Sequence, residues 1–456
     1  MLKSATGLER VPCPLDPSHT VYKRNLEAHM KICGVTSTQS AQEAEGVFCL
    51  NCNSGVPATI PSAGSDVVDA SALANKVHSV FEQHVAPHVQ LYISGVYNAP
   101  PCDPADASLY GEVHKDIIGA QSASEKTRHA DQDTAILAVM AREGLISREG
   151  VRDVRDNIYV EFGAGKGFLG YSVQLYYHML MKQLSVKNSS KCSASDAADV
   201  VDAASVRPKL LLVERSGCRR KADNKQSATN NKYDEGYSNN CYRYRLDIRH
   251  AFLPTILNQM LVKDKAAVPS HEAPKKVIVV AKHLCGVATD MSVRSLEKLQ
   301  KHNIENTDAV NAAPYGVAIA TCCHHICNWD DYIGREWMEG HGFTGPEFAL
   351  LKTWSCWGTM PVEAQRGSRE APTVSGSSAN ADGEDESEHK AAPPVSARPA
   401  GITREQMRTL GREIKCLIDF GRAWYMKEVL KFSDVKYTQY CASTVTPECR
   451  VLLGKR

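Results

Sequence analysis

The chain has 456 residues, of which 43% are hydrophobic, and its formal net charge is +1 at pH 7. This length is enough for about two or three domains, and no apolar run approaches the ~20 residues that cross a membrane. A charge so near zero means that any nucleic-acid binding must use local basic patches. Met1–Arg10 lack the apolar segment of a secretory signal. The 16 cysteines therefore indicate reduced thiols and metal ligands of an intracellular protein, cytoplasmic or nuclear.

The first predicted element is a small metal-binding module over residues 10–36. Cys13, His19, His29 and Cys33 have the spacing C-x5-H-x9-H-x3-C, and four nitrogen and sulfur ligands so close in sequence suit a tetrahedral Zn²⁺ site. His29 and Cys33 lie one helical turn apart, so one helix face presents both ligands. The segment resembles the CHHC zinc finger of minor-spliceosome proteins and certain tRNA methyltransferases. So short a segment needs its metal to fold.

Residues 37–143 are interpreted as a linker and a helical lead-in to the next domain. Cys49-Leu50-Asn51-Cys52 forms a Cys-x-x-Cys pair without a second pair nearby, which is only half of an ordinary zinc site. Two helical stretches follow within about 70–143, separated by Pro100-Pro101. Neither stretch carries a residue pattern that indicates a function.

The rest of the chain, residues 144–456, alternates strands and helices. Strands are predicted over 158–162, 209–214, 242–247, 277–282 and 317–321, and helices over 167–182 and 288–302. Such alternation predicts an α/β fold with a parallel sheet covered by helices on both faces. A ligand site is then expected at the carboxyl ends of the strands.

Two later strands, 347–353 and 435–443, are expected to add an antiparallel hairpin to this sheet. A long helix over 404–430 is predicted between them, because Thr403 and Gln406 make a capping box ahead of an apolar face at helical spacing. Three polar stretches, 188–206, 222–240 and 362–401, carry too little apolar surface to offset the entropy of ordering and are predicted to be disordered insertions.

The most informative motif is the glycine-rich turn that follows the strand 158–162. It reads Glu161-Phe162-Gly163-Ala164-Gly165-Lys166-Gly167, and such glycines let the backbone approach a ligand closely. A dinucleotide fingerprint needs glycine or alanine where this chain has Phe168, and the Gly-Lys-Ser/Thr ending of a P-loop is absent. The pattern resembles motif I of class I S-adenosylmethionine-dependent methyltransferases. A glycine-rich turn without a ligand is the alternative.

Acidic residues close the next two predicted strands. Glu214 follows the apolar run Leu210–Val213, and Asp247 follows the less regular strand 242–247. In a sheet that binds a nucleoside cofactor at its carboxyl edge, Glu214 is expected to hold the ribose hydroxyls and Asp247 to contact the adenine region. Taken singly, either acid is equally consistent with a surface carboxylate.

Reactive side chains crowd the ends of the fourth and fifth predicted strands. The fourth runs into Lys282-His283-Leu284-Cys285-Gly286-Val287-Ala288-Thr289-Asp290, and the fifth into Thr321-Cys322-Cys323-His324-His325-Ile326-Cys327. Strand ends so rich in lysine, histidine and cysteine are unsuited to a hydrophobic core, so we expect them at the carboxyl edge of the sheet, where the reacting groups belong. Two alternatives are a second zinc site made by Cys322, Cys323, His324 and Cys327, and a cysteine nucleophile.

Taken together, the CHHC finger, Glu161–Gly167, Lys282–Asp290 and Thr321–Cys327 resemble the eukaryotic tRNA 2′-O-ribose methyltransferase family that modifies nucleotide 4 of the acceptor stem. Leu417–Arg422 is similar to that family's C-terminal helix. The resemblance implies a class I, Rossmann-like sheet, S-adenosylmethionine as methyl donor, structural zinc and tRNA as partner. The family usually carries a further cysteine/histidine finger ahead of the CHHC one, and only Met1–Pro12 precede Cys13.

The resemblance implies methyl transfer from a sulfonium to a ribose 2′-hydroxyl, for which alignment of the reactants is the main requirement. Lys282 or His283 is expected to orient or deprotonate the hydroxyl, with Asp290 and His324 in support. A basic cluster is a candidate phosphate surface: Arg215, Arg219, Arg220, Lys221 and Lys225. Alternative functions are an RNA-binding protein with an inert methyltransferase domain, and a methyltransferase acting on another RNA or on protein.

Overall fold

The computed structural model describes twelve stretches of the chain: 9–14, 16–32, 34–56, 68–89, 104–120, 126–146, 151–189, 207–217, 240–264, 275–306, 311–360 and 398–456. Most of each predicted insertion, 188–206, 222–240 and 362–401, lies outside these residues. Every helix in the described stretches is too short or too polar to traverse a lipid bilayer.

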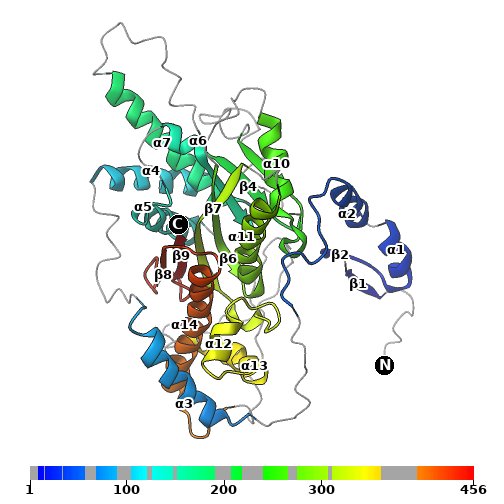
Figure 1. The fold of residues 1–456 in the computed structure, drawn as a ribbon, viewed down its shortest axis with the longest axis vertical. Helices are drawn as coiled ribbons and strands as arrows, with labels where there is room; N and C mark the ends of the chain where they lie inside the picture. The colour runs from blue at the N-terminus through cyan, green and yellow to red at the C-terminus, as the bar shows by residue number, and fades with distance from the viewer. Residues whose placement is uncertain are drawn as a thin grey trace, which may run out of the picture.

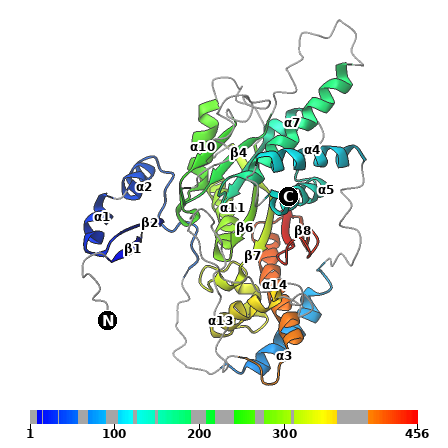
Figure 2. The same ribbon diagram turned by 180° about the vertical axis from the view of Figure 1, so that it is seen from behind.

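The N-terminal module is a two-stranded antiparallel sheet followed by helices, and it stands beside the larger sheet in both views (Figure 1, Figure 2). Its elements are β1 (Arg10–Cys13), β2 (Asp16–Tyr22), a 3-10 turn (Lys23–Asn25), α1 (Leu26–Ile32) and α2 (Gly34–Ala44). The segment after α2 holds the module to the main domain. Phe48 makes an isolated bridge with Ala251, and Asn53 Nδ2 donates to the carbonyls of Ile248 and Ala251 at 2.7 and 2.9 Å.

The main domain is built on a seven-stranded sheet in the order β5-β4-β3-β6-β7-β9-β8. The strands are β3 (Asn157–Phe162), β4 (Lys209–Val213), β5 (Cys241–Tyr244), β6 (Lys275–Cys285), β7 (Ala312–Cys322), β8 (Asp434–Gln439) and β9 (Arg450–Lys455). β3 to β7 pair in parallel, and β9 runs antiparallel to both of its neighbours. The predicted mixed α/β fold with a mostly parallel sheet is therefore confirmed.

Alternate residues of each strand supply two separate cores, one on each face of the sheet. On β3, Ile158, Val160 and Phe162 belong to one core and Tyr159 to the other. The first face is covered by α3 (Ala70–Val80), α10 (Leu253–Asp264), α11 (Val287–Glu305), α12 (Arg335–Gly340), α13 (Gly345–Trp354) and α14 (Arg404–Glu428). The second is covered by α4 (Pro104–Ala120), α5 (Lys126–Arg142), α6 (Val151–Asp156) and α7 (Phe168–Ser189). Burial on both faces explains why the strands are almost continuously apolar.

One predicted strand of the hairpin is wrong. Residues 347–353 lie inside α13, which begins with a capping box between Thr344 and Glu347 and has proline in its first turn. The prediction of a strand over 435–443 is close, since β8 covers Asp434–Gln439, but its partner is β9. A short apolar run does not by itself distinguish a buried helix from a strand. The capping box of Thr344 and Glu347 is the feature of the sequence that indicates a helix here.

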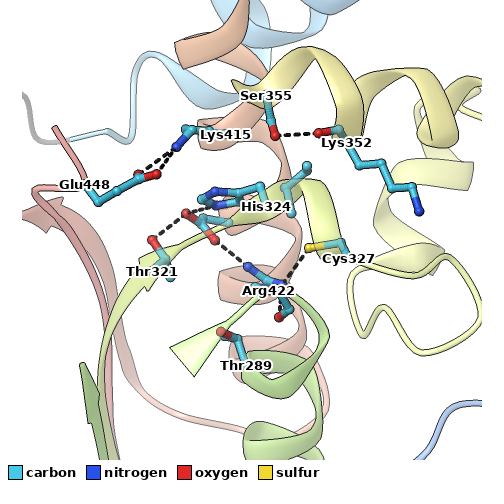
Figure 3. A network of polar contacts seen from close by, with 12 residues as sticks. Thr289, Thr321, His324, Cys327, Lys352, Ser355, Lys415, Arg422 and Glu448 are labelled. Carbon is cyan, nitrogen blue, oxygen red and sulfur yellow. Dashed lines mark hydrogen bonds and ion pairs between the residues drawn. The ribbon is translucent and has the colours of Figure 1, made fainter. Parts of the chain in front are cut away.

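α14 begins as predicted, with Thr403 and Gln406 forming a reciprocal capping box. A fully buried guanidinium joins this helix to the sheet (Figure 3). Arg422 donates to both carboxylate oxygens of Asp290 at the start of α11, at 2.9 and 2.7 Å, and to Asp419 Oδ1 at 2.8 Å. Asp419 Oδ2 in turn accepts from Thr321 Oγ1 at 2.7 Å and pairs with His324 Nε2 at 2.8 Å.

These five side chains, Asp290, Thr321, His324, Asp419 and Arg422, are called the α14 cluster here. Asp290, Asp419 and Arg422 are 0% exposed. Burial alone would raise the pKa of Asp419, but His324 and Arg422 together with Thr321 hold it well below its usual range. The cluster therefore keeps the Asp419 carboxylate and the Arg422 guanidinium inside the protein as a buried ion pair, which is stable only while the two stay together.

Replacing Arg422 by Met is expected to lower the free energy of unfolding by about 3–5 kcal/mol, because it leaves buried carboxylates without their cation. Chemical denaturation of the full chain measures the change. Lys301→Ala removes the pair of an exposed lysine with Glu297 and is the control, with an expected change below about 0.5 kcal/mol. Adding Asp290→Asn and Asp419→Asn to Arg422→Met should restore part of the loss. Equal effects of Arg422→Met and Lys301→Ala would contradict a role for the cluster in docking α14.

Candidate active site at the carboxyl edge of the sheet

The glycine-rich turn leaves β3 at the carboxyl edge in a left-handed backbone. Gly163, Gly165 and Gly167 have φ of 61°, 48° and 78°, a region that glycine enters without steric cost. A Cβ on Gly167 would lie 2.8 Å from the Arg243 guanidinium and 3.0 Å from Leu212, whereas a Cβ on Gly165 would meet nothing within 4 Å. The space on the Cβ side of Gly165 is thus open, and the turn fits the close approach of a nucleotide-type cofactor.

Glu214 lies where the second strand was predicted to present an acid. Its Oε2 accepts from the backbone N–H of Gly165 at 2.9 Å, and its Oε1 accepts from Ser216 at 2.8 Å. Asp247 lies further along, beyond the end of β5, where it caps a 3-10 turn through Arg249 N at 2.9 Å and pairs with Arg215 at 3.6 Å. The two segments are joined by a backbone bond from Leu246 N to Glu214 O at 3.2 Å.

A second group of charges lies under the same turn. Glu161 is buried at the end of β3 and accepts from Gly170 N at 2.8 Å. Lys282 Nζ, on the neighbouring β6, lies 2.5 Å from Oδ1 of Asp133 on α5. Burial raises the pKa of Glu161 to about 8; Asp133 adds to the rise, while Gly170 N–H and Lys282 oppose it. Burial also raises the pKa of Asp133, against the pull of Lys282. One buried carboxyl, Asp133, is thus paired with Lys282, while the other, Glu161, is held by the Gly170 N–H.

His283 occupies a bulge at the end of β6. The pairing with β7 shifts between Lys282 and Leu284, and His283 has φ of 62°, which is uncommon for a residue other than glycine. Its Nε2 lies 3.3 Å from Gln132 Oε1. Although the ring reaches solvent, loss of solvation and the nearby Lys282 and His129 lower the pKa of His283 to about 4. Bulges and strained backbone of this kind are common beside active sites.

The other two predicted catalytic residues lie in a different place. Asp290 is paired with Arg422 and His324 with Asp419, so both belong to the buried α14 cluster and neither lines the exposed edge beside Lys282 and His283. His324 Nδ1 has no hydrogen-bond partner among the residues that the structure describes. The four predicted catalytic residues therefore fall into two groups: Lys282 and His283 lie at the exposed edge, and Asp290 and His324 lie in the buried α14 cluster.

The alternative zinc set of Cys322, Cys323, His324 and Cys327 is not assembled as a unit. His324 faces Asp419, and Cys327 Sγ accepts from Arg422 Nη2 at 3.2 Å. Of the basic cluster 215–225, only Arg215 is among the described residues, and it pairs with Asp247.

Several site residues lie outside the predicted set. Gln132 and Asp133 on α5 contact His283 and Lys282, which are themselves consecutive. Asp133 falls at helical spacing with the buried Ala130, Leu137 and Met140. An acidic residue within such an apolar helix face indicates a buried carboxyl that needs a polar partner, so the sequence does carry a signal for Asp133. Asp419 and Arg422 lie in the segment that carried the family resemblance, but sequence alone does not reveal their partners.

In the N-terminal module, the structure brings together two of the four predicted zinc ligands. Cys13 is buried, and its Sγ lies 3.3 Å from His29 Nε2. Sulfur and nitrogen ligands of one tetrahedral zinc ion lie about 3.5 Å apart, given bonds of ~2.3 and ~2.0 Å, so the pair fits a shared ion. The side chain of His19 and all of Cys33 lie outside the described residues.

Comparisons with known proteins identify both regions. A family described as "Methyltransferase TRM13" matches residues 131–455, and the "U11-48K-like CHHC zinc finger" matches residues 10–34. The relatives include the "tRNA:m(4)X modification enzyme TRM13 homolog" of Mus musculus, 24% identical over 92% of this chain and 81% of the relative. "tRNA:m(4)X modification enzyme TRM13" of Saccharomyces cerevisiae is 24% identical over 96% of this chain and 83% of the relative. No solved structure matches the chain.

The methyltransferase match covers most of the chain, including the glycine-rich turn, Lys282-His283, the α14 cluster and Asp133 on α5. Methyl transfer in this family uses S-adenosylmethionine as donor, and the CHHC finger is a zinc module. On this evidence the chain belongs to the TRM13 methyltransferase family and carries a CHHC zinc finger ahead of its methyltransferase region.

Proposed function

We propose that this chain transfers the methyl group of S-adenosylmethionine to the ribose 2′-hydroxyl of nucleotide 4 in the acceptor stem of tRNA. The observation that carries the proposal is the meeting of the glycine-rich turn with Lys282 and His283 at one sheet edge, in a chain that belongs to the TRM13 family. The printed names of its relatives, tRNA:m(4)X modification enzymes, support the same substrate.

The fold supports a class I methyltransferase domain. Five parallel strands precede a C-terminal hairpin, and β9 of that hairpin inserts antiparallel between β7 and β8. The glycine-rich turn follows β3, the central parallel strand. The carboxyl end of this strand is the position at which a doubly wound sheet binds its ligand. We accordingly assign the predicted domain 144–456 to this class, extended on its N-terminal side by α5, which supplies Asp133.

Acidic side chains lie where the cationic cofactor is proposed to bind. Gly163, Gly165 and Gly167 would hold the donor through their backbone, and Glu214 and Asp247 would bind its ribose and adenine. Burial is the main reason that the pKa of Glu161 is raised to about 8, and Asp133 adds to the rise. A positively charged donor would lower this pKa again, because a nearby cation favours the ionised carboxylate.

Lys282 and His283 are assigned to the 2′-hydroxyl. With Gln132 Oε1 accepting from Nε2–H of His283, the other ring nitrogen, Nδ1, keeps its lone pair and can accept the hydroxyl proton. Lys282, held by Asp133, donates a hydrogen bond to the same oxygen and stabilises negative charge as it develops. Asp290 and His324 act as positioning residues, since both are buried and fix the strand ends through their contacts with α14.

The proposed target lies within an A-form duplex. Proteins recognise such RNA through its shape, phosphates and 2′-hydroxyls rather than through base edges. The CHHC finger and the basic cluster of Arg215, Arg219, Arg220, Lys221 and Lys225 are the proposed contacts, because lysine and arginine side chains bind backbone phosphates. The protein is expected to act inside the cell, where its tRNA substrate is found.

The function is tested with purified full-length protein, S-adenosylmethionine carrying a labelled methyl group and unmodified tRNA transcripts. We expect a labelled 2′-O-methylnucleotide at position 4, located by nuclease mapping and mass spectrometry. A transcript with a 2′-deoxynucleotide only at position 4 is the matched control and should receive no label, because it lacks the nucleophile. Label in both transcripts, label in protein alone, or donor binding without any transfer would each contradict the proposal.

Replacing Glu161 by Gln removes the buried charge while keeping the shape. We expect the affinity for S-adenosylmethionine to fall roughly 10- to 100-fold, which is the loss of one charge-assisted interaction. Binding by the native protein should release a proton from Glu161, so its affinity should rise as pH increases towards about 8. Calorimetry of both proteins from pH 6 to 9 isolates this residue, because every other titration is shared. Parallel pH profiles for the two proteins would rule out the assignment.

Lys282→Ala and His283→Ala are expected to slow single-turnover methyl transfer by about 10²- to 10⁴-fold, with unchanged donor affinity for His283→Ala. Lys276→Ala, at the opposite end of β6, is the control and should leave the rate unchanged. Asp290→Asn and His324→Ala should instead lower thermal stability and lose activity in proportion to unfolded protein. Wild-type rates in folded Lys282→Ala and His283→Ala proteins would refute their assignment.

A further inference from the structure

Three cysteine thiols converge beside Lys282 and His283, and the proposed chemistry uses none of them. The sulfur atoms of Cys285, Cys322 and Cys323 all lie within 4.8 Å of one another, and those of Cys285 and Cys322 are 3.4 Å apart. Cys285 and Cys322 are directly paired at the ends of β6 and β7. Cys323 follows in a left-handed backbone with φ of 39°, which places its sulfur beside those of the two paired residues.

We propose that Cys285, Cys322 and Cys323 form a second metal site that binds Zn²⁺ through three thiolates, separate from the CHHC finger. Two thiolates on one tetrahedral zinc ion lie about 3.8 Å apart, given Zn–S bonds of ~2.3 Å. The 3.4 Å between Cys285 and Cys322 is close to that value and the other two separations are at most 4.8 Å, so small side-chain rotations bring all three sulfurs to one ion. Three thiolates select a borderline-soft ion such as zinc over magnesium or calcium.

The surroundings favour a bound cation over three neighbouring thiols. Cys322 is buried, while Cys285 and Cys323 are half-buried, so an ion can enter from the solvent side and keep a fourth position there. Zinc binding would displace the protons of the three thiols, because the thiolate is the form that coordinates the metal.

This set differs from the one that the sequence motif indicates. The segment 322–327 supplies only two of the ligands, because His324 and Cys327 are directed to Asp419 and Arg422. The third ligand comes from the neighbouring strand, just beyond the His283 bulge. An ion here would tie the ends of β6 and β7 together next to the proposed reacting groups. The proposal concerns metal binding alone and stands independently of the substrate.

The test uses full-length, zinc-free protein kept reduced and titrated with Co²⁺, whose thiolate charge-transfer absorption grows with the number of Co–S bonds. Cys13→Ser disables the finger, so the remaining absorption reports the second site. In this background we expect one tightly bound ion, a loss of most of that absorption on adding Cys322→Ser, and no loss on adding Cys356→Ser as the control. Metal analysis of the zinc-loaded proteins should follow the same order.

Cys285→Ser is the second variant, because its half-buried side chain can be replaced with less disturbance than that of Cys322. Circular dichroism and S-adenosylmethionine binding show whether each protein is folded. The proposal is overturned if folded Cys13→Ser protein binds no Co²⁺, or if folded Cys285→Ser protein keeps the full absorption. It is equally overturned if peptide mapping of protein purified under reducing conditions shows Cys285 and Cys322 joined as a disulfide.

Discussion

The candidate site depends on one ammonium group placed among buried carboxyls. Lys282 projects from β6, Asp133 meets it from α5 at 2.5 Å, and Glu161 lies on the adjacent β3. Separating Lys282 from Asp133 would leave a charge unpaired in a low-dielectric interior, which costs several kcal/mol. The pair thus fixes α5 against the strand that carries the proposed reacting groups. Burial raises the pKa of the neighbouring Glu161 to about 8, and a sulfonium donor would favour its ionised form.

The sheet edge is held from both faces by buried charge rather than by apolar packing alone. α5 reaches it through Asp133 and Gln132, and α14 reaches it from the other side through Arg422 and Asp419. Apolar contacts are non-directional and tolerate sliding, whereas paired ions with fixed hydrogen bonds tolerate little. This difference explains why the carboxyl ends of β6 and β7 carry so many polar side chains without losing a defined arrangement.

The sequence predicts the parallel strands well because β3, β4, β6 and β7 are buried on both faces and read as continuous apolar runs. It also predicts α14, whose capping box and apolar face are local signals. The strand over 347–353 is wrong because a short apolar run has no decisive period, and the local signal that indicates a helix, the capping box of Thr344 with Glu347, lies just ahead of that run. The charge pairs Lys282–Asp133 and Arg422–Asp290 join residues more than a hundred positions apart, and no local pattern reveals such partners.

The His283 bulge changes which way the end of β6 faces. Ile278, Val280 and Lys282 point to the α5 side, and strict alternation would send residue 284 to that side as well. The extra residue reverses the parity, so Leu284 instead joins the opposite core and lies against Gly163. A single strand thereby offers its last charged residue to one layer and its next apolar residue to the other. Deleting His283 would make Lys282 and Leu284 consecutive and leave them on these opposite sides, so what the extra residue adds is the exposed histidine itself, set outside the ladder at the sheet edge.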